Sequence, residues 1–154
     1  NGHPIAAVIT TPDIAAVFNN GMEYFNSFGG NPVSCAIALS VLNVIEKEKL
    51  QQNALDVGNY LLLELNILKK KIEFIADVRG KGLFIGVELV ENRKTMDPAP
   101  EKAKEIINKM KEIRILISTD GPFNNVLKIK PPMVLSMENA QLIIESLEEK
   151  FSGI

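Results

Sequence analysis

The sequence has 154 residues, 46% of them hydrophobic and 23% charged, which is the composition of about one globular domain with a sizeable core. The net charge is −2 at pH 7 with lysines and glutamates interspersed, so the chain lacks the charge pattern of a nucleic-acid-binding or membrane-surface protein. No apolar run reaches the length of a membrane span, and a single cysteine excludes an intrachain disulfide, which favours the reducing cytoplasm. One histidine and one cysteine cannot form a zinc cage, so we expect no metal site.

The first 47 residues predict three elements. An apolar run over residues 5–11 predicts a buried strand, residues 13–20 predict a short helix, and residues 33–47 predict a long helix without a breaker. The sequence does not begin with methionine, and a core strand starts almost at once. We therefore expect a piece of a longer chain.

A glycine-containing turn precedes the long helix, and we call residues 24–32 the glycine turn. Gly29 and Gly30 allow positive φ and close approach, and Asn31 followed by Pro32 predicts an N-cap and a first-turn proline. The turn would bring hydroxyl, amide and N–H groups to the start of the helix, where an anion is favoured. An ordinary loop-to-helix junction with a glycine cap is the alternative.

From about residue 45 onward, helices alternate with pairs of strands, which predicts a compact α/β domain with antiparallel strands. The apolar stripe of the first helix predicts core residues. The expected helices are 50–71, 101–111 and one beginning after the cap Ser136; the expected strands are 72–78, 83–90, 113–118 and 126–130, the last two joined by a turn at 119–122; and the stripe consists of Leu50, Ala54, Val57, Leu61, Leu65 and Leu68.

Three basic residues and one histidine are candidates for a site. Arg79 lies between an apolar strand and two glycines, and its guanidinium is suited to binding a carboxylate through two parallel hydrogen bonds, although a surface or ion-paired role is the alternative. Lys128 and Lys130 alternate with apolar residues, so both should leave the core face, either as a solvated face or as cations near a site. His3, beside Gly2 and Pro4, is expected to be a turn residue rather than a base.

Four segments in order resemble the class-III pyridoxal-phosphate-dependent aminotransferases, and the resemblance covers essentially the whole chain. Within that family the sequence is most similar to the branch that holds alanine–glyoxylate aminotransferase 2-like proteins and ethanolamine-phosphate phospho-lyases. The segments are Asn1-Gly2-His3-Pro4-Ile5-Ala6-Ala7-Val8, Phe25-Asn26-Ser27-Phe28-Gly29-Gly30-Asn31-Pro32, Asp77-Val78-Arg79-Gly80-Lys81-Gly82-Leu83 and Lys130-Pro131-Pro132-Met133.

The resemblance implies the C-terminal part of a fold-type-I enzyme that uses pyridoxal 5′-phosphate (PLP). Residues 1–45 would be the end of the large cofactor-binding domain, including the start of the interdomain helix, and residues 46–154 would be the small domain. The enzyme would be a homodimer with active sites at the subunit interface. It would act on small amino and oxo substrates, without nucleic acid or membrane as a partner.

The resemblance also implies roles for individual residues. Ser27 stands where the family usually has threonine and would bind the cofactor phosphate of the partner subunit, with Asn26 and Gly29 contributing to that site. Arg79 would bind the substrate carboxylate. The lysine that forms the Schiff base would lie upstream of residue 1, so no catalytic residue is expected in this chain and the fragment alone should be inactive.

Transamination is the leading reaction. Lys128 and Lys130 depart from the arginine and small residue that many members carry before the double proline, so elimination of phosphate from a phosphorylated amine such as phosphoethanolamine is an alternative. A non-catalytic fragment or dimerisation module is a third possibility of another class.

Overall fold

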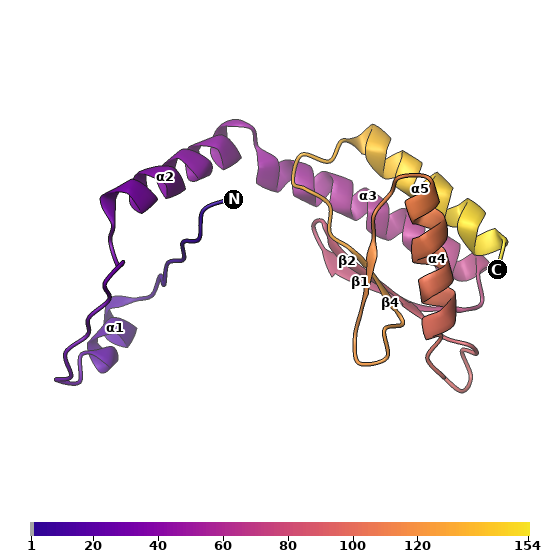
Figure 1. Cartoon of the computed structure of the whole chain (residues 1–154), viewed down its shortest axis with the longest axis horizontal. Coiled ribbons are helices and arrows are strands. Elements are labelled where there is room, and N and C mark those ends of the chain that lie inside the picture. Colours follow the sequence, from indigo (N-terminus) through magenta and orange to yellow (C-terminus); the bar gives the residue numbers. More distant parts are fainter. Residues whose placement is uncertain (1) are drawn as a thin grey trace. The chain divides into compact units, whose positions relative to one another are not determined.

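The computed structural model describes residues 2–154 and contains two compact units, one ending at Glu48 and the other beginning at Lys49 (Figure 1). Asn1, the first residue of the turn expected at the start of the sequence, lies outside the described residues. Each unit is described by itself below.

The first unit contains helices α1 (Pro12–Phe18) and α2 (Pro32–Lys47). The predicted cap of α2 is confirmed, because Asn31 Oδ1 accepts a hydrogen bond from the Ser34 N–H at 3.1 Å and a proline occupies the first turn. The strand predicted over 5–11 is wrong for the described chain. A strand exists only where its backbone groups pair with a neighbour, and no described segment pairs with this one, so Val8 is 93% exposed.

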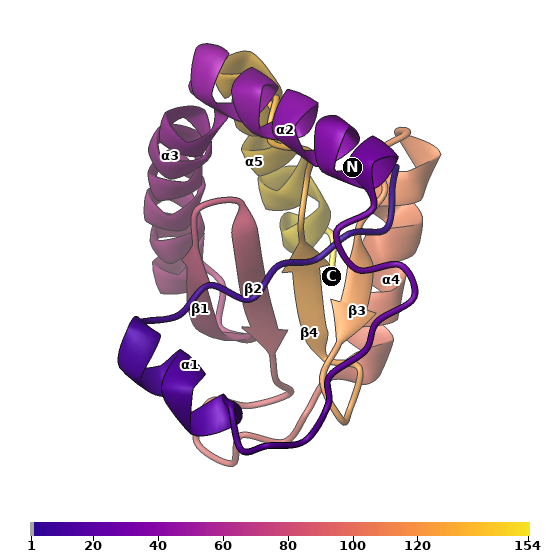
Figure 2. The ribbon, with the colours of Figure 1, turned by 90° about the vertical axis from the view of Figure 1, so that its left-hand side faces the viewer.

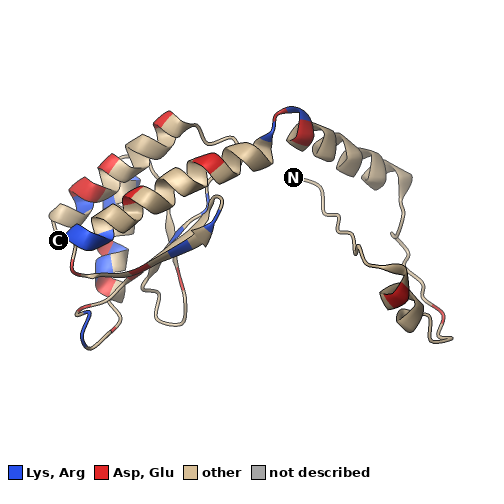
Figure 3. Ribbon diagram, turned by 180° about the vertical axis from the view of Figure 1, so that it is seen from behind, with Lys and Arg blue, Asp and Glu red and all other residues tan. Residues whose placement is uncertain are grey.

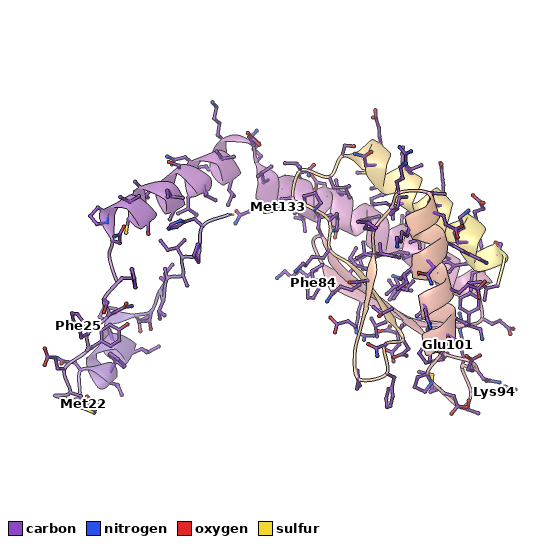
Figure 4. The ribbon with its side chains drawn as sticks, in the orientation of Figure 1. Met22, Phe25, Phe84, Lys94, Glu101 and Met133 are labelled. Atoms are coloured by element: carbon purple, nitrogen blue, oxygen red, sulfur yellow. The ribbon has the colours of Figure 1, made fainter. Side chains whose placement is uncertain are left out.

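The surface of the first unit is apolar and almost free of charge. Asp13 and Glu23 are the only charged residues before Glu46, and none of the described residues 2–48 is buried (Figure 3). So many exposed apolar side chains are characteristic of a surface that packs against further protein. The exposed side chains, two of which are labelled in Figure 4, include Val8, Ile9, Phe18, Met22, Tyr24, Phe25 and Phe28.

The second unit is a four-stranded antiparallel sheet with three helices on one face, so the predicted α/β fold is confirmed. The strand order is β1-β2-β4-β3, and α5 lies between α3 and α4 behind the sheet (Figure 2). The elements are α3 (Leu50–Lys71), β1 (Ile75–Lys81), β2 (Phe84–Leu89), α4 (Pro100–Glu112), β3 (Ser118–Asp120), β4 (Val126–Ile129) and α5 (Met137–Ser152).

Two predicted strands are displaced along the sequence. The first begins at Ile75 rather than at residue 72, because Ile72 is the C-cap of α3 and its N–H donates to Leu68 O. It then continues through Gly80 to Lys81, and the connection is the short turn Gly82–Leu83. The strand expected over 113–118 is replaced by β3, which shares only Ser118 with that range and includes two residues of the expected turn, because the end of α4 and a turn occupy residues 113 and 114.

Alternation along the strands separates a core face from an open face. On β2 and β4 the buried residues face the helices, while Gly86, Glu88 and Lys128 lie on the opposite face, which we call the open face. Four members of the predicted α3 stripe are fully buried, and Leu50 and Ala54 are partly buried. The buried members of the stripe are Val57, Leu61, Leu65 and Leu68, and the buried strand residues are Ile85, Val87, Leu89, Leu127 and Ile129.

A close contact between two glycines fixes the β1–β2 hairpin against α3. A Cβ on Gly58 would lie 2.2 Å from Gly82 O, so the helix approaches the turn backbone directly. Gly82 has a φ of +55° and opens the two-residue turn, the position that a type II′ turn reserves for glycine. The end of β1 that carries Arg79 is therefore held in place by backbone contact.

Arg93 connects the loop after β2 to the junction between α3 and β1. Its guanidinium donates to the carbonyl oxygens of Ile75 at 3.1 Å and Ile72 at 2.6 Å, and also to that of Lys69. The bond to Lys69 satisfies a carbonyl group in the last turn of α3, where the helix itself supplies no partner. Among the described residues, no helix has both the length and the apolar character needed to cross a bilayer.

Candidate functional site

Asn26 organises the glycine turn through its backbone and its side chain. Its carbonyl oxygen accepts from the Gly29 N–H at 3.1 Å, and its Oδ1 accepts from the Phe28 N–H at 3.1 Å. A Cβ on Gly29 would lie 3.1 Å from Asn26 Cβ, and Gly30 has a φ of +68°. Glycine is therefore required at position 30 by conformation and favoured at position 29 by space.

Ser27 is exposed at the same turn. Within residues 2–154 its hydroxyl makes no hydrogen bond, so it remains available as a donor. No charged residue occurs between Glu23 and Glu46, so the turn offers hydroxyl and N–H donors without a carboxylate to repel an anion. This donor set fits a phosphate group.

On the open face of the second unit, two cations lie on either side of a glycine in one row across the sheet. Arg79 of β1 is paired with Gly86 of β2, and Gly86 is paired with Lys128 of β4. The neighbouring row contains Asp77, paired with Glu88. Cations and carboxylates therefore occupy adjacent rows.

Arg79 uses one end of its guanidinium for ion pairs. Its Nη1 donates to Asp77 Oδ2 at 2.9 Å and to Glu88 Oε2 at 2.6 Å, and its side chain is 52% exposed. The hydrogen bond from Arg79 holds the pKa of Asp77 below its ordinary value of 3.8. The described residues make no hydrogen bond to Nη2 or Nε of Arg79, so the edge suited to a bidentate carboxylate remains open.

Lys128 is held by a single carboxylate. Its Nζ lies 2.8 Å from Asp120 Oδ2, while Asp120 Oδ1 accepts from the Gly121 N–H at 2.8 Å. The hydrogen bond from Lys128 and that from Gly121 lower the pKa of Asp120. Asp120 is therefore fixed at both oxygens and holds the lysine over the sheet.

An open hollow of about 490 Å³ lies between these groups, a volume typical of small-molecule sites. Phe84, 60% exposed and labelled in Figure 4, forms an apolar part of its wall. The lining consists of Arg79, Gly80, Lys81, Phe84, Ile85, Gly86, Asp120, Gly121, Val126 and Lys128.

Comparison with known proteins identifies the family. Residues 1–151 match the family described as Aminotransferase class-III. The chain belongs to the class-III aminotransferases. This family is PLP-dependent, and the fold-type-I resemblance seen in the sequence is thereby confirmed.

Three of its relatives carry names that differ in reaction. The chain is 52% identical to an alanine–glyoxylate aminotransferase 2-like protein of Drosophila melanogaster, over 100% of this chain and 32% of the relative. It is similar to a phospholyase from Arthrobacter in complex with phosphoethanolamine, with a TM-score of 0.90 and 38% identity over 99% of this chain and 36% of the other. It is also similar to a PLP-bound amine transaminase from an uncultivated Pseudomonas species. The TM-score is 0.73 and the identity is 32%, over 84% of this chain and 29% of the other. The chain thus spans about a third of the length of these relatives.

The residues predicted for the site lie in both units of this aminotransferase chain. Ser27, Asn26 and Gly29 share the glycine turn of the first unit, whereas Arg79 lies on the open face of the second. Sequence reasoning placed Lys128 off the core face correctly but missed Gly86 and the ion pair between Asp120 and Lys128. Strand alternation from Phe84 to Leu89 would have placed Gly86 on the open face, whereas the partner of Asp120 depends on the register of β3.

Proposed function

We propose that this chain is the C-terminal part of a PLP-dependent enzyme that transfers an amino group between an amino acid or amine and an oxo-acid. Residues 1–45 would complete its large domain, and residues 46–154 would form its small domain. Family membership supports the chemistry. The open edge of the Arg79 guanidinium is the observation that carries the substrate assignment.

The glycine turn is proposed to hold the phosphate of PLP across the interface of a homodimer. Ser27 would donate from its hydroxyl, while Asn26 and Gly29 keep the turn in the shape that presents the N–H groups. PLP, when bound, serves as an electron sink for the substrate. The exposed apolar surface of the first unit supports an extensive interface with further protein.

Arg79 is proposed to bind the substrate carboxylate. Asp77 and Glu88 both contact Nη1 and orient the guanidinium, so the opposite edge points away from them. A carboxylate bound at that edge would form two parallel hydrogen bonds, a geometry that lysine cannot reproduce. This interaction would select amino acids over simple amines.

Phospho-lyase activity is a second candidate, supported by Lys128. This second cation lines the same hollow, and the Arthrobacter relative is described as a phospholyase with phosphoethanolamine. A phosphate dianion is well matched to two cations, whereas an amino acid carboxylate needs only one.

The full-length enzyme distinguishes the two reactions. Incubated with phosphoethanolamine and no oxo-acid, a phospho-lyase releases inorganic phosphate and ammonia, and both products are measured by standard assays. A transaminase releases neither and instead converts an amino acid and an oxo-acid stoichiometrically. We expect turnover to depend on the oxo-acid, and phosphate release without one would establish the second candidate instead.

A further inference from the structure

Gly86 lies in the middle of a strand without a conformational reason to be glycine. Glycine inside a strand weakens it and often marks a place where a ligand or another backbone approaches closely. The glycines with positive φ in the described chain do not include Gly86. Its role therefore lies in the space that a side chain would fill.

That space is bounded by Val126 and Arg79. A Cβ on Gly86 would lie 3.1 Å from Val126 Cγ1 and 4.0 Å from Arg79 Cγ. Neighbouring strands are about 4.8 Å apart, so the Cα atoms of Arg79 and Lys128 on either side of β2 are about 10 Å apart. Both side chains are long enough to reach a group seated over Gly86.

The groups that line this space include more cations than carboxylates. The side chains that line the hollow include three cations, Arg79, Lys81 and Lys128, and one carboxylate, Asp120. Asp77 and Glu88 bind Nη1 of Arg79 from the adjacent row and are absent from the lining. Within the lining the cations are in excess, while Asp77 and Glu88 offset the charge of Arg79 from outside it.

We propose that Gly86 sets the size of the anionic group that this site accepts, leaving room between Arg79 and Lys128 for a tetrahedral phosphate. A carboxylate is planar and binds to one edge of the arginine, so it does not need the space over β2. A phosphate has acceptor oxygens in several directions and uses both cations. The inference rests on the proposed function, which places the substrate anion at Arg79.

The test uses the full-length enzyme loaded with PLP, so that the glycine turn is already occupied. The variants are G86A, V126A and the double variant G86A/V126A, in which removal of Val126 Cγ1 relieves the 3.1 Å contact. Calorimetry measures the Kd of inorganic phosphate, and kinetics measure the KM of phosphoethanolamine and of L-alanine. The absorbance of bound PLP and the melting temperature report folding.

The methyl group added by G86A should raise the Kd of phosphate and the KM of phosphoethanolamine by about tenfold or more, the equivalent of one charged hydrogen bond. It should change the KM of L-alanine by less than about threefold. The double variant should show the same selective loss relative to V126A. Recovery of phosphate affinity in the double variant, or an equal loss for L-alanine, would overturn the inference. The absence of any phosphate binding to the wild-type enzyme would also overturn the inference.

An Arg79→Lys variant separates this inference from the proposed function. If R79K raises the KM of L-alanine and the Kd of phosphate while G86A changes neither, the proposed site at Arg79 is supported and the proposed role of Gly86 is wrong. If R79K affects neither ligand, the substrate anion is not at Arg79 and the proposed site itself fails.

Discussion

Replacing Arg79 with lysine tests the substrate assignment most directly. In the structure Asp77 and Glu88 both bind Nη1, at 2.9 and 2.6 Å, and leave the edge formed by Nη2 and Nε open. A lysine ammonium keeps the positive charge and the ion pairs with these carboxylates, but it has no second edge. The variant should therefore lose the bidentate contact with substrate while keeping the local charge balance.

The expected magnitude follows from the contacts that are lost. A hydrogen bond to a charged group contributes about 1.5–3 kcal/mol, so kcat/KM for L-alanine should fall by roughly ten- to a hundredfold. The Arg79 side chain is 52% exposed, so its ion pairs contribute at most about 1 kcal/mol to folding and the melting temperature should change little. The affinity for PLP should stay the same.

The assay is a steady-state transamination with the full-length enzyme, with PLP binding measured in parallel. Arg93→Lys is a matched control, because Arg93 binds carbonyl groups at the end of α3 and does not line the hollow. It should lower the melting temperature without changing kcat/KM. An unchanged kcat/KM for Arg79→Lys would show that Arg79 is a surface ion-pair residue, and the substrate assignment would be abandoned.

Three further predictions concern the hairpin, the carboxylate row and the glycine turn. Gly58→Ala places a Cβ 2.2 Å from Gly82 O, so an overpacking cost of about 1–3 kcal/mol should exceed the gain in helix propensity of about 1 kcal/mol; a urea denaturation that shows no loss of stability would contradict this. Because the pKa of Asp77 is lowered below 3.8, this residue stabilises the fold above about pH 4, and the contribution is lost as the pH falls through the lowered pKa; the difference in melting temperature between wild type and Asp77→Asn should be present at pH 7 and should shrink steadily as the pH is lowered below 4. Ser27→Ala should lower the affinity for PLP by about ten- to a hundredfold in the full-length homodimer. In a mixed dimer whose other subunit lacks the Schiff-base lysine, the Ser27→Ala subunit should bind PLP normally, and weak binding there would place Ser27 in its own subunit's site.

Local signals in the sequence were sufficient for the helices. Asn31 before Pro32 and Ser136 before the last helix both accept the capping hydrogen bonds that were expected. The apolar stripe of α3 predicted four fully buried residues, because a period of three and four residues places them on one side of a helix. The antiparallel pairing of β1 with β2 followed from the short glycine connection.

Features that depend on distant partners were not predictable in the same way. Residues 5–11 have the composition of a strand, but no partner for them occurs in the described chain, so they form none. The glycines after Arg79 suggested the end of a strand, whereas Gly80 continues β1 because the backbone of β2 lies close: a Cβ there would be 2.4 Å from Phe84 O. The row from Arg79 through Gly86 to Lys128 requires the register of three strands, and the sequence alone does not specify it.

The distribution of charge in the first unit also determines how this protein responds to trypsin. The protease cleaves after lysine and arginine, and the first such residue is Lys47, at the end of α2, followed by Lys49 at the start of the second unit. Digestion therefore leaves residues 1–47 together in one long peptide, folded or not, while cutting the second unit at many positions. Mass spectrometric mapping of a modification near Ser27 needs a protease that cleaves at aromatic residues, such as Phe25 and Phe28 on either side of it.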